Sequence, residues 1–324
     1  MADYSEGPDL AGSRGFQSVR ERLYAGVFFT FAAATVLTTI AIFLTLLVDA
    51  VEFFRAYSPI DFLTGLSWSP SLEPVSFGVL PLVFGTLVVT GIAALIAIPI
   101  GTLTAVYLSE YAASRTRAVL KPLLEILAGV PTVIYGFFAL VYVTPAIGFF
   151  FPQVSTFNVL SASVMVGIMT IPMVSSISED AMSAVPDSLR QAGYGMGATK
   201  YEVTTDIVVP AATSGIVSSY ILAISRAIGE TMIVTVAMGM QSSIPAVRSA
   251  TVFGVNVPFV HPGEIFLESG QTMTAAMVQI ANSDIAGGTL AYRSLFAIGL
   301  TLFVITLLMN IVSNVISERY REEY

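Results

Sequence analysis

Long runs without a charged residue constrain this chain more than any other feature of its sequence. The four longest runs cover Leu23–Val48, Pro74–Ser109, Ile126–Ser178 and Ser294–Ser317. A helix of about 20 apolar residues spans the hydrocarbon core of a bilayer, so each run can cross a membrane at least once. The third run is broken by Pro145, Pro152 and Asn158 and is long enough for two crossings. The sequence therefore predicts an all-α integral membrane protein.

Composition agrees with a membrane protein and narrows the chemistry it can carry. Hydrophobic residues make up 55% of the 324 residues, charged residues make up 11%, and the mean hydropathy is +0.81. The absence of cysteine excludes disulfides and thiolate metal sites, and the single histidine, His261, argues against a histidine-built metal site. A net charge of −8 gives no support to nucleic-acid binding, which requires a basic surface. We therefore expect no metal site and no nucleic-acid partner.

The hydropathy pattern predicts a bundle of six spanning helices. They are expected at residues 23–50, 79–109, 122–144, 159–178, 212–240 and 291–316. Basic residues concentrate in the segments that lie on one side if the N-terminus is inside. These residues are Arg14, Arg20, Arg22, Arg115, Arg117, Lys121, Arg190, Lys200, Arg319 and Arg321. Because positive charge accumulates on the cytoplasmic side, we predict a multi-pass protein of the cell membrane with both termini in the cytoplasm.

The predicted spans divide the chain into tails, loops and a transmembrane domain. The expected parts are a cytoplasmic tail at 1–22, a peripheral first transmembrane helix at 23–50, an extracytoplasmic segment at 51–78, a transmembrane domain at 79–316 and a cytoplasmic tail at 317–324. The first helix is much longer than a signal-peptide core, so we read it as retained. The domain contains an inner loop at 179–210 and an outer loop at 241–290, in which GQTMTAAMVQIA predicts a short helix against the bundle.

The inner loop carries the clearest local signals. Two capping boxes are expected, Ser188 with Gln191 and Thr199 with Glu202, and they predict short helices that begin near Leu189 and Lys200. Gly197 lies between them and can supply the left-handed residue that ends the first helix. On that helix Leu189, Ala192, Gly193 and Met196 share a face, where the small residues would admit another backbone. The loop contains no G-x-x-x-x-G-K-[ST] motif, so any energy for uphill transport must come from a partner or an ion gradient.

The spacing within this loop resembles a known motif. Gln191-Ala192-Gly193, three residues, Gly197, nine residues and then Ile207-Val208-Val209-Pro210 is similar to the EAA loop of ABC importer membrane subunits. That pattern reads E-A-A, three residues, G, nine residues and I-x-L-P, and the loop forms a coupling helix that docks in a groove of the ATPase subunit. The resemblance assigns ATPase coupling to Leu189, Gln191, Ala192, Gly193, Gly197, Ile207 and Pro210. The departures are Gln191 for Glu, Gly193 for Ala and Val209 for Leu.

Five further blocks are informative: FLTGLSWSP at 62–70, FGVLPLVFGTL at 77–87, LSEYA at 108–112, LEILAGVPTVIYGFFAL at 124–140 and SRAIGETM at 225–232. Together they resemble the phosphate-specific ABC permeases, PstC more closely than its paralogue PstA. This resemblance implies a MetI-like permease core and a non-enzymatic subunit that forms half of a phosphate pathway in the lipid bilayer. It also implies three partners: a PstA-like permease, PstB-like ATPase subunits and a PstS-like extracytoplasmic binding protein. The chain itself would hold no cofactor, because ATP and Mg would bind to the ATPase.

Arg226 and Glu230 stand in an otherwise uncharged stretch, from Ile207 to Val247. Four residues apart on a helix, they would share one face. Burying either alone is costly, so they form a mutual ion pair or face a translocation pathway. We favour the pathway, in which the guanidinium binds phosphate and Glu230 holds Arg226 or accepts a bond from protonated phosphate.

Glu110 and Glu125 lie near inner helix ends, where we expect them to snorkel to the interface. A permease for sulfate, molybdate or tungstate is an alternative function. An ion-gradient carrier and a membrane sensor are alternatives of other classes.

Overall fold

The structure is a computed structural model that describes residues 14–71, 73–242, 247–252, 255–260 and 262–319. The chain divides into two units, Met1–Asp49 and Ala50–Tyr324. Within the described residues, five helices are long and apolar enough to cross a membrane: Arg20–Ala56, Leu80–Tyr111, Thr132–Phe150, Val159–Ser183 and Leu290–Val312. A sixth crossing is formed if Lys200–Ala211 and Thr213–Ile228, which meet at 69°, are taken as one span. The prediction of an all-α membrane bundle is confirmed.

The smaller unit consists of most of α1, which runs without interruption over Arg14–Ala56. The expected first span at 23–50 lies wholly within this helix. Its peripheral position in the bundle stays a prediction. The last turns of α1 belong to the larger unit, in which Ala50 and Phe53 are fully buried.

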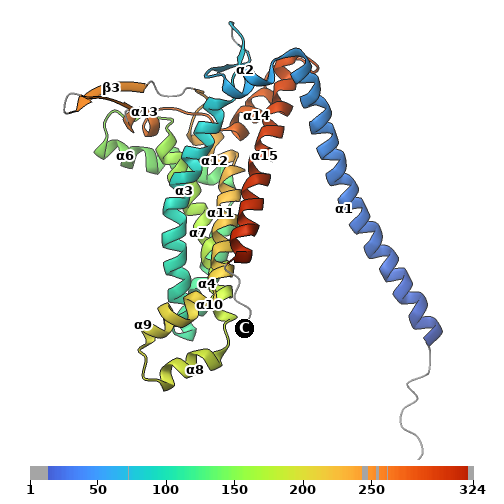
Figure 1. Cartoon of the computed structure of the whole chain (residues 1–324), viewed down its shortest axis with the longest axis vertical. Coiled ribbons are helices and arrows are strands. Elements are labelled where there is room, and N and C mark those ends of the chain that lie inside the picture. The colour runs from blue at the N-terminus through green and yellow to red at the C-terminus, as the bar shows by residue number, and fades with distance from the viewer. Residues whose placement is uncertain (1–13, 72, 243–246, 253–254, 261, 320–324) are drawn as a thin grey trace, which may run out of the picture. The chain divides into compact units, whose positions relative to one another are not determined.

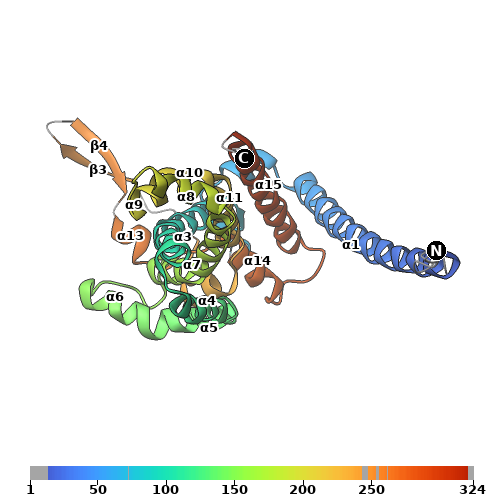
Figure 2. The same cartoon turned by 90° about the horizontal axis from the view of Figure 1, so that it is seen from below.

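Three helices form the centre of the larger unit: α3 (Leu80–Val106), α7 (Val159–Ser183) and α11 (Thr213–Ile228). They lie side by side (Figure 1, Figure 2). Ala97 and Ala223 meet Val174 where the three helices pack, and small residues of this kind let helices in a membrane approach closely. Hydroxyl pairs join the helices as well, Ser178–Ser219 at 2.8 Å and Thr102–Tyr220 at 2.7 Å.

The third span differs from the expected 122–144. It is built from α4 (Ser114–Ala128), then α5 (Thr132–Phe138), the π-helix η2 (Ala139–Val143) and α6 (Thr144–Phe150). The helix is interrupted at residues 129–131, because Val130 precedes Pro131 and the residue before a proline disfavours helical backbone. The membrane-crossing segment therefore begins at Thr132, and α4 is a separate helix.

One end of the bundle carries the elements around the predicted outer loop (Figure 1). They are α2 (Pro59–Thr64), the pair β1 (Trp68–Ser69) and β2 (Ser76–Phe77), the hairpin β3 (Val247–Val252) and β4 (Val255–Val260), α13 (Pro262–Phe266) and α14 (Met273–Ala281). The expected helix in GQTMTAAMVQIA is confirmed as α14, which is largely buried. Thr272 caps this helix, and the Thr86 hydroxyl of α3 accepts the N–H of Met273 at 3.0 Å. The two strand pairs were not expected from the sequence.

The opposite end carries a compact helical element between α7 and α11 (Figure 1). Its parts are α8 (Asp187–Gly195), α9 (Lys200–Val203), the π-helix η3 (Thr204–Val208) and α10 (Val209–Ala211). Another π-helix, η1 (Tyr107–Tyr111), continues α3 at this end. The bundle is completed by α12 (Met232–Ala237) and by α15 (Leu290–Arg319), which packs against α11 and α14.

Candidate functional site

The element α8–α9 forms where the sequence predicts the two short helices, although only one capping box is present. The Thr199 hydroxyl accepts the N–H of Glu202, and the Glu202 carboxylate accepts the N–H of Thr199 at 2.7 Å. The predicted Ser188–Gln191 box is wrong, because α8 already begins at Asp187 after Pro186 and its N-cap makes no side-chain bond. Gly197 confirms its expected role: its φ of +88° is left-handed, directly after the C-cap of α8.

Gly193 fixes how α8 sits on the rest of the element. It is buried, and a Cβ at this position would lie 2.7 Å from Cδ1 of Ile207 and 2.9 Å from Cγ2 of Val203. The close approach predicted at this small residue is therefore made by side chains of the same loop and not by another backbone. Gly193 and Ile207 thus hold the element together.

The remaining coupling candidates lie at different depths on the element. Leu189 is half-buried against a hydrophobic cluster to which α3, the end of α7, α9, η3 and α11 contribute. Gln191, Ala192 and Pro210 are exposed, as is Met196, with 82% of its surface accessible. The expected shared face of α8 is therefore split between a buried part and an exposed part. The exposed part leaves Gln191 and Ala192 open to a partner.

Arg190 of α8, which the sequence did not single out, occupies the junction of three elements. Its guanidinium donates to the carbonyl of Met182 at 2.8 Å and to that of Val185, and it pairs with the carboxylate of Glu110 at 3.1 Å. The side chains of Arg190 and Glu110 are only 14% and 6% exposed. The expectation that Glu110 snorkels to the interface is therefore wrong, because this carboxylate is buried and paired.

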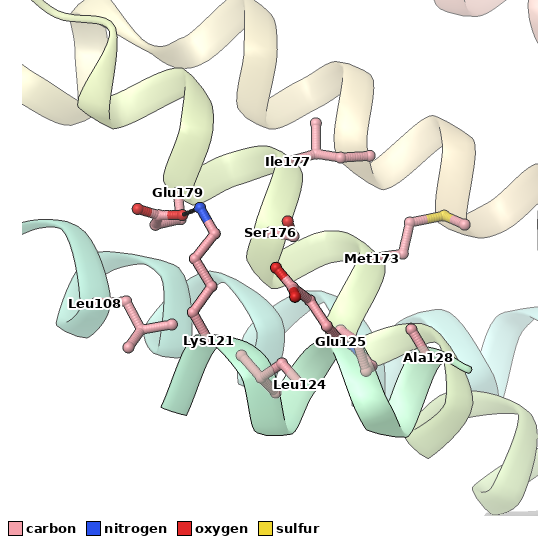
Figure 3. Close-up of a pocket in the computed structure, with 10 residues that line it drawn as sticks. Leu108, Lys121, Leu124, Glu125, Ala128, Met173, Ser176, Ile177 and Glu179 are labelled. Carbon is pink, nitrogen blue, oxygen red and sulfur yellow. Dashed lines mark hydrogen bonds and ion pairs between the residues drawn. The ribbon is translucent and has the colours of Figure 1, made fainter. Parts of the chain in front are cut away.

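A second ionic cluster joins α4 to α7 (Figure 3). The Glu179 side chain is 1% exposed and accepts bonds from the Arg117 guanidinium, from Lys121 Nζ at 2.7 Å and from the Ser183 hydroxyl at 3.3 Å. Beside it lies a cavity of about 250 Å³ between the two helices, into which Glu125 projects. This cluster fixes the position of α4, the helix that precedes the break at Pro131.

Arg226 and Glu230 do not share a helix face. The helix α11 ends at Ile228 with Gly229 as its C-cap, so the expected single helix over 212–240 is wrong, and so is the pairing by helical spacing. Glu230 is 7% exposed, and its carboxylate accepts the N–H groups of Met232 at 2.9 Å and Ile233 at 3.2 Å. It therefore caps the start of α12. Arg226 is exposed, and its guanidinium has no ion-pair partner among the described residues.

The depth of Arg226 in the bundle follows from helix register. The Ser178–Ser219 bond places Ser219 five residues from the end of α7, at Ser183, and Arg226 lies seven residues further along α11. At 1.5 Å per residue, Arg226 is roughly 18 Å from that end of a helix about 37 Å long. The arginine therefore lies near the middle of the bundle. Within the described part of the chain, no group of three or more metal-ligating side chains is present.

Apolar spanning helices that pack on small residues, with a helical element between two spans, define a polytopic helical membrane protein. Residues 97–322 match the family described as binding-protein-dependent transport system inner membrane component. The chain belongs to this family of ABC importer permease subunits. Such a subunit is not itself catalytic, and it works with an ATPase and a binding protein.

Individual proteins support this assignment. The probable ABC transporter permease protein YqgH of Bacillus subtilis is 31% identical over 89% of this chain and 88% of its own length. The phosphate transport system permease protein PstC of Mesorhizobium japonicum is 33% identical over 77% of this chain and 75% of its own. A bacterial alginate ABC transporter, crystallised with its alginate-bound periplasmic protein, has the same fold, with a TM-score of 0.63, 13% identity and coverage of 95% and 98%.

Proposed function

We propose that this chain is the PstC-like permease subunit of an ATP-driven phosphate importer. Its similarity to a phosphate permease supports the substrate, and the tryptophan-containing block at 62–70 and the block at 124–140 support PstC over PstA. A PstA-like permease would supply the other half of the pathway. A PstS-like protein would deliver phosphate on the side of α14. PstB-like subunits, which bind ATP and Mg, would dock against α8 and α9 in the cytoplasm, where both termini would also lie.

The exposed guanidinium of Arg226 is the observation that carries this proposal. An arginine at the centre of a membrane costs about 2.5–3.5 kcal/mol on insertion scales, so another chain or a water-filled path is expected to cover it. Phosphate carries about 1.5–2 negative charges at neutral pH, and its oxygens match the two parallel N–H donors of a guanidinium. Arg226 would therefore form a transient anion site in the pathway, while Glu230 fixes the helix break beside it.

The test is uptake of labelled phosphate by vesicles that contain the complete complex. Replacing Arg226 by Gln should nearly abolish uptake while the ATPase still copurifies, because the substitution removes the anion site and leaves the coupling element intact. Arg115→Gln is the matched control, since Arg115 is an exposed arginine of α4. It should transport normally. Normal transport by the Arg226 variant would remove this residue from the pathway.

Competition identifies the substrate. Excess sulfate, molybdate or tungstate should leave phosphate uptake unchanged, and suppression by one of them would assign the permease to that oxyanion. Membership of the ABC importer family favours ATP-driven transport over an ion-gradient carrier or a sensor. Uptake that persists with an inactive ATPase would nevertheless contradict the proposal.

A further inference from the structure

We propose that Arg190 is a positioning residue that transmits movement of α8 directly to the second span through Glu110. This inference rests on the proposed coupling role of α8 and α9, and it adds a route that the chain connections do not provide. Along the chain, the element is joined only to α7 and α11. Glu110 lies in η1, which continues α3. The Arg190–Glu110 pair therefore links the element to a helix from which it is separated by 80 residues of sequence.

Several hydrogen bonds fix the position of the Arg190 guanidinium. One terminal nitrogen, Nη2, donates to Glu110 at 3.1 Å and to the Met182 carbonyl at 2.8 Å. The other, Nη1, donates to the Val185 carbonyl and lies 3.4 Å from the carboxylate of Asp187. Three of these acceptors, from the segment that ends α7 and from η1, tie Arg190 to neighbouring elements, whereas Asp187 belongs to α8 itself. A lysine has a single nitrogen and cannot reproduce this arrangement.

Burial makes the Arg190–Glu110 pair difficult to separate. The Glu110 side chain is 6% exposed, and its Oε1 accepts the Ser109 hydroxyl at 2.8 Å in addition to the bond from Arg190. Separating a buried ion pair is strongly destabilising, because each charge that stays buried is left without a compensating partner. Movement of α8 relative to η1 would leave the buried Glu110 carboxylate without its cation. The two elements are therefore expected to move together.

A second contact joins the same two parts. Lys200 begins α9, and its Nζ lies 5.0 Å from the centroid of the Tyr111 ring, the last residue of η1. Both groups are exposed, so this cation–π contact is the weaker of the two. It nevertheless links α9 to η1, close to the point at which Arg190 links α8 to η1. Both helices of the coupling element are thus tied to the end of the second span.

The variants Glu110→Gln and Arg190→Lys test the role of the Arg190–Glu110 pair in the complete complex reconstituted in vesicles. The quantities measured are ATPase copurification, ATP hydrolysis and phosphate transported per ATP hydrolysed. Each variant should keep the ATPase bound and should lower phosphate per ATP about tenfold, within the range of interaction energies for residues in contact. The double variant should be no worse than the worse single variant, because both substitutions break the same link.

Asp187→Asn is the matched control. Asp187 also contacts Arg190, but its side chain is 87% exposed and it lies on α8 itself, so losing its charge leaves the link to η1 intact. This variant should keep wild-type phosphate per ATP. The proposal is overturned if Glu110→Gln and Arg190→Lys both keep the wild-type ratio, or if their effects simply add. Loss of assembly in both would also overturn it, since the pair would then be required for folding and not for transmission. A wild-type chain that neither binds an ATPase nor imports phosphate would refute the proposed function instead.

Discussion

Two glycines of α8 allow the packing of the coupling element to be measured with a matched pair of variants. Gly193 and Gly195 lie two residues apart in the same helix. A Cβ at Gly193 would meet Ile207 and Val203 at 2.7 and 2.9 Å, whereas a Cβ at Gly195 would meet nothing within 4 Å. The same substitution, Gly to Ala, therefore adds one methyl group to a filled position and to an open one.

The expected magnitudes have opposite signs. Alanine favours a helix over glycine by up to about 1 kcal/mol, and less near a helix end, so Gly195→Ala should be neutral or slightly stabilising. Gly193→Ala gains the same propensity but must displace two side chains. Overpacking of this kind costs typically 1–3 kcal/mol. Val203 is β-branched and fully buried, so it yields less readily than the flexible end of Ile207. We expect a net destabilisation of α8 docking by about 1–2 kcal/mol.

Hydrogen exchange measures this quantity locally. Exchange of amides in residues 187–199 reports the opening of α8, and about 1.4 kcal/mol corresponds to a tenfold faster exchange. Gly193→Ala should accelerate exchange roughly five- to thirtyfold, while Gly195→Ala should leave it unchanged or slow it. Equal exchange in the two variants would refute the conclusion that Gly193 holds α8 against α9 and η3.

Two further substitutions test the ionic cluster and the cap. Glu179→Gln leaves Arg117 and Lys121 without their shared counter-ion. Breaking a fully buried pair lowers the free energy of unfolding by roughly 3–5 kcal/mol. Because the two cations are 38% and 33% exposed, we expect a smaller loss of about 2 kcal/mol. Thermal unfolding of the purified chain in detergent measures this loss. The control Asp180→Asn, at a side chain that is 65% exposed, should change the unfolding midpoint little. Equal midpoints for the two variants would contradict the conclusion that Glu179 holds the ionic cluster together. Thr199→Ala should destabilise α9 by about 1 kcal/mol and speed exchange in residues 199–208. Thr205→Ala removes only two exposed hydroxyl bonds and should not speed exchange. Exchange that is no faster in the Thr199 variant than in the Thr205 control would show that the cap does not stabilise α9.

Local signals explain why the coupling element could be predicted in detail. The Thr199–Glu202 box and Gly197 act within three residues of themselves, so the sequence alone determines them. The same holds for α14, which begins after the capping residue Thr272. The Ser188 box failed because Pro186, two residues earlier, starts the helix first. One competing local signal was sufficient to shift the helix start.

The ionic clusters could not be predicted because they depend on packing between distant segments. Glu179 is 62 and 58 positions from Arg117 and Lys121, and Glu110 is 80 positions from Arg190. Hydropathy places all of these charges near span ends, where exposure to water is the usual expectation. Tertiary packing instead buries the two carboxylates against cations. The useful signal was that opposite charges gather at the same end of the bundle, although the sequence does not show which of them pair.

The separation of Arg226 from Glu230 has a consequence for the pathway. Their spacing of four residues predicts a pair only if one helix continues through both, and Gly229 ends that helix. Each charge then lies near the helix end that favours it: Arg226 in the last turn of α11, where carbonyls point outward, and Glu230 at the first N–H groups of α12. Neither charge needs the other for stabilisation. An anion that reaches Arg226 would therefore have no ion pair to break, which lowers the barrier at the position where the proposed pathway requires only weak binding.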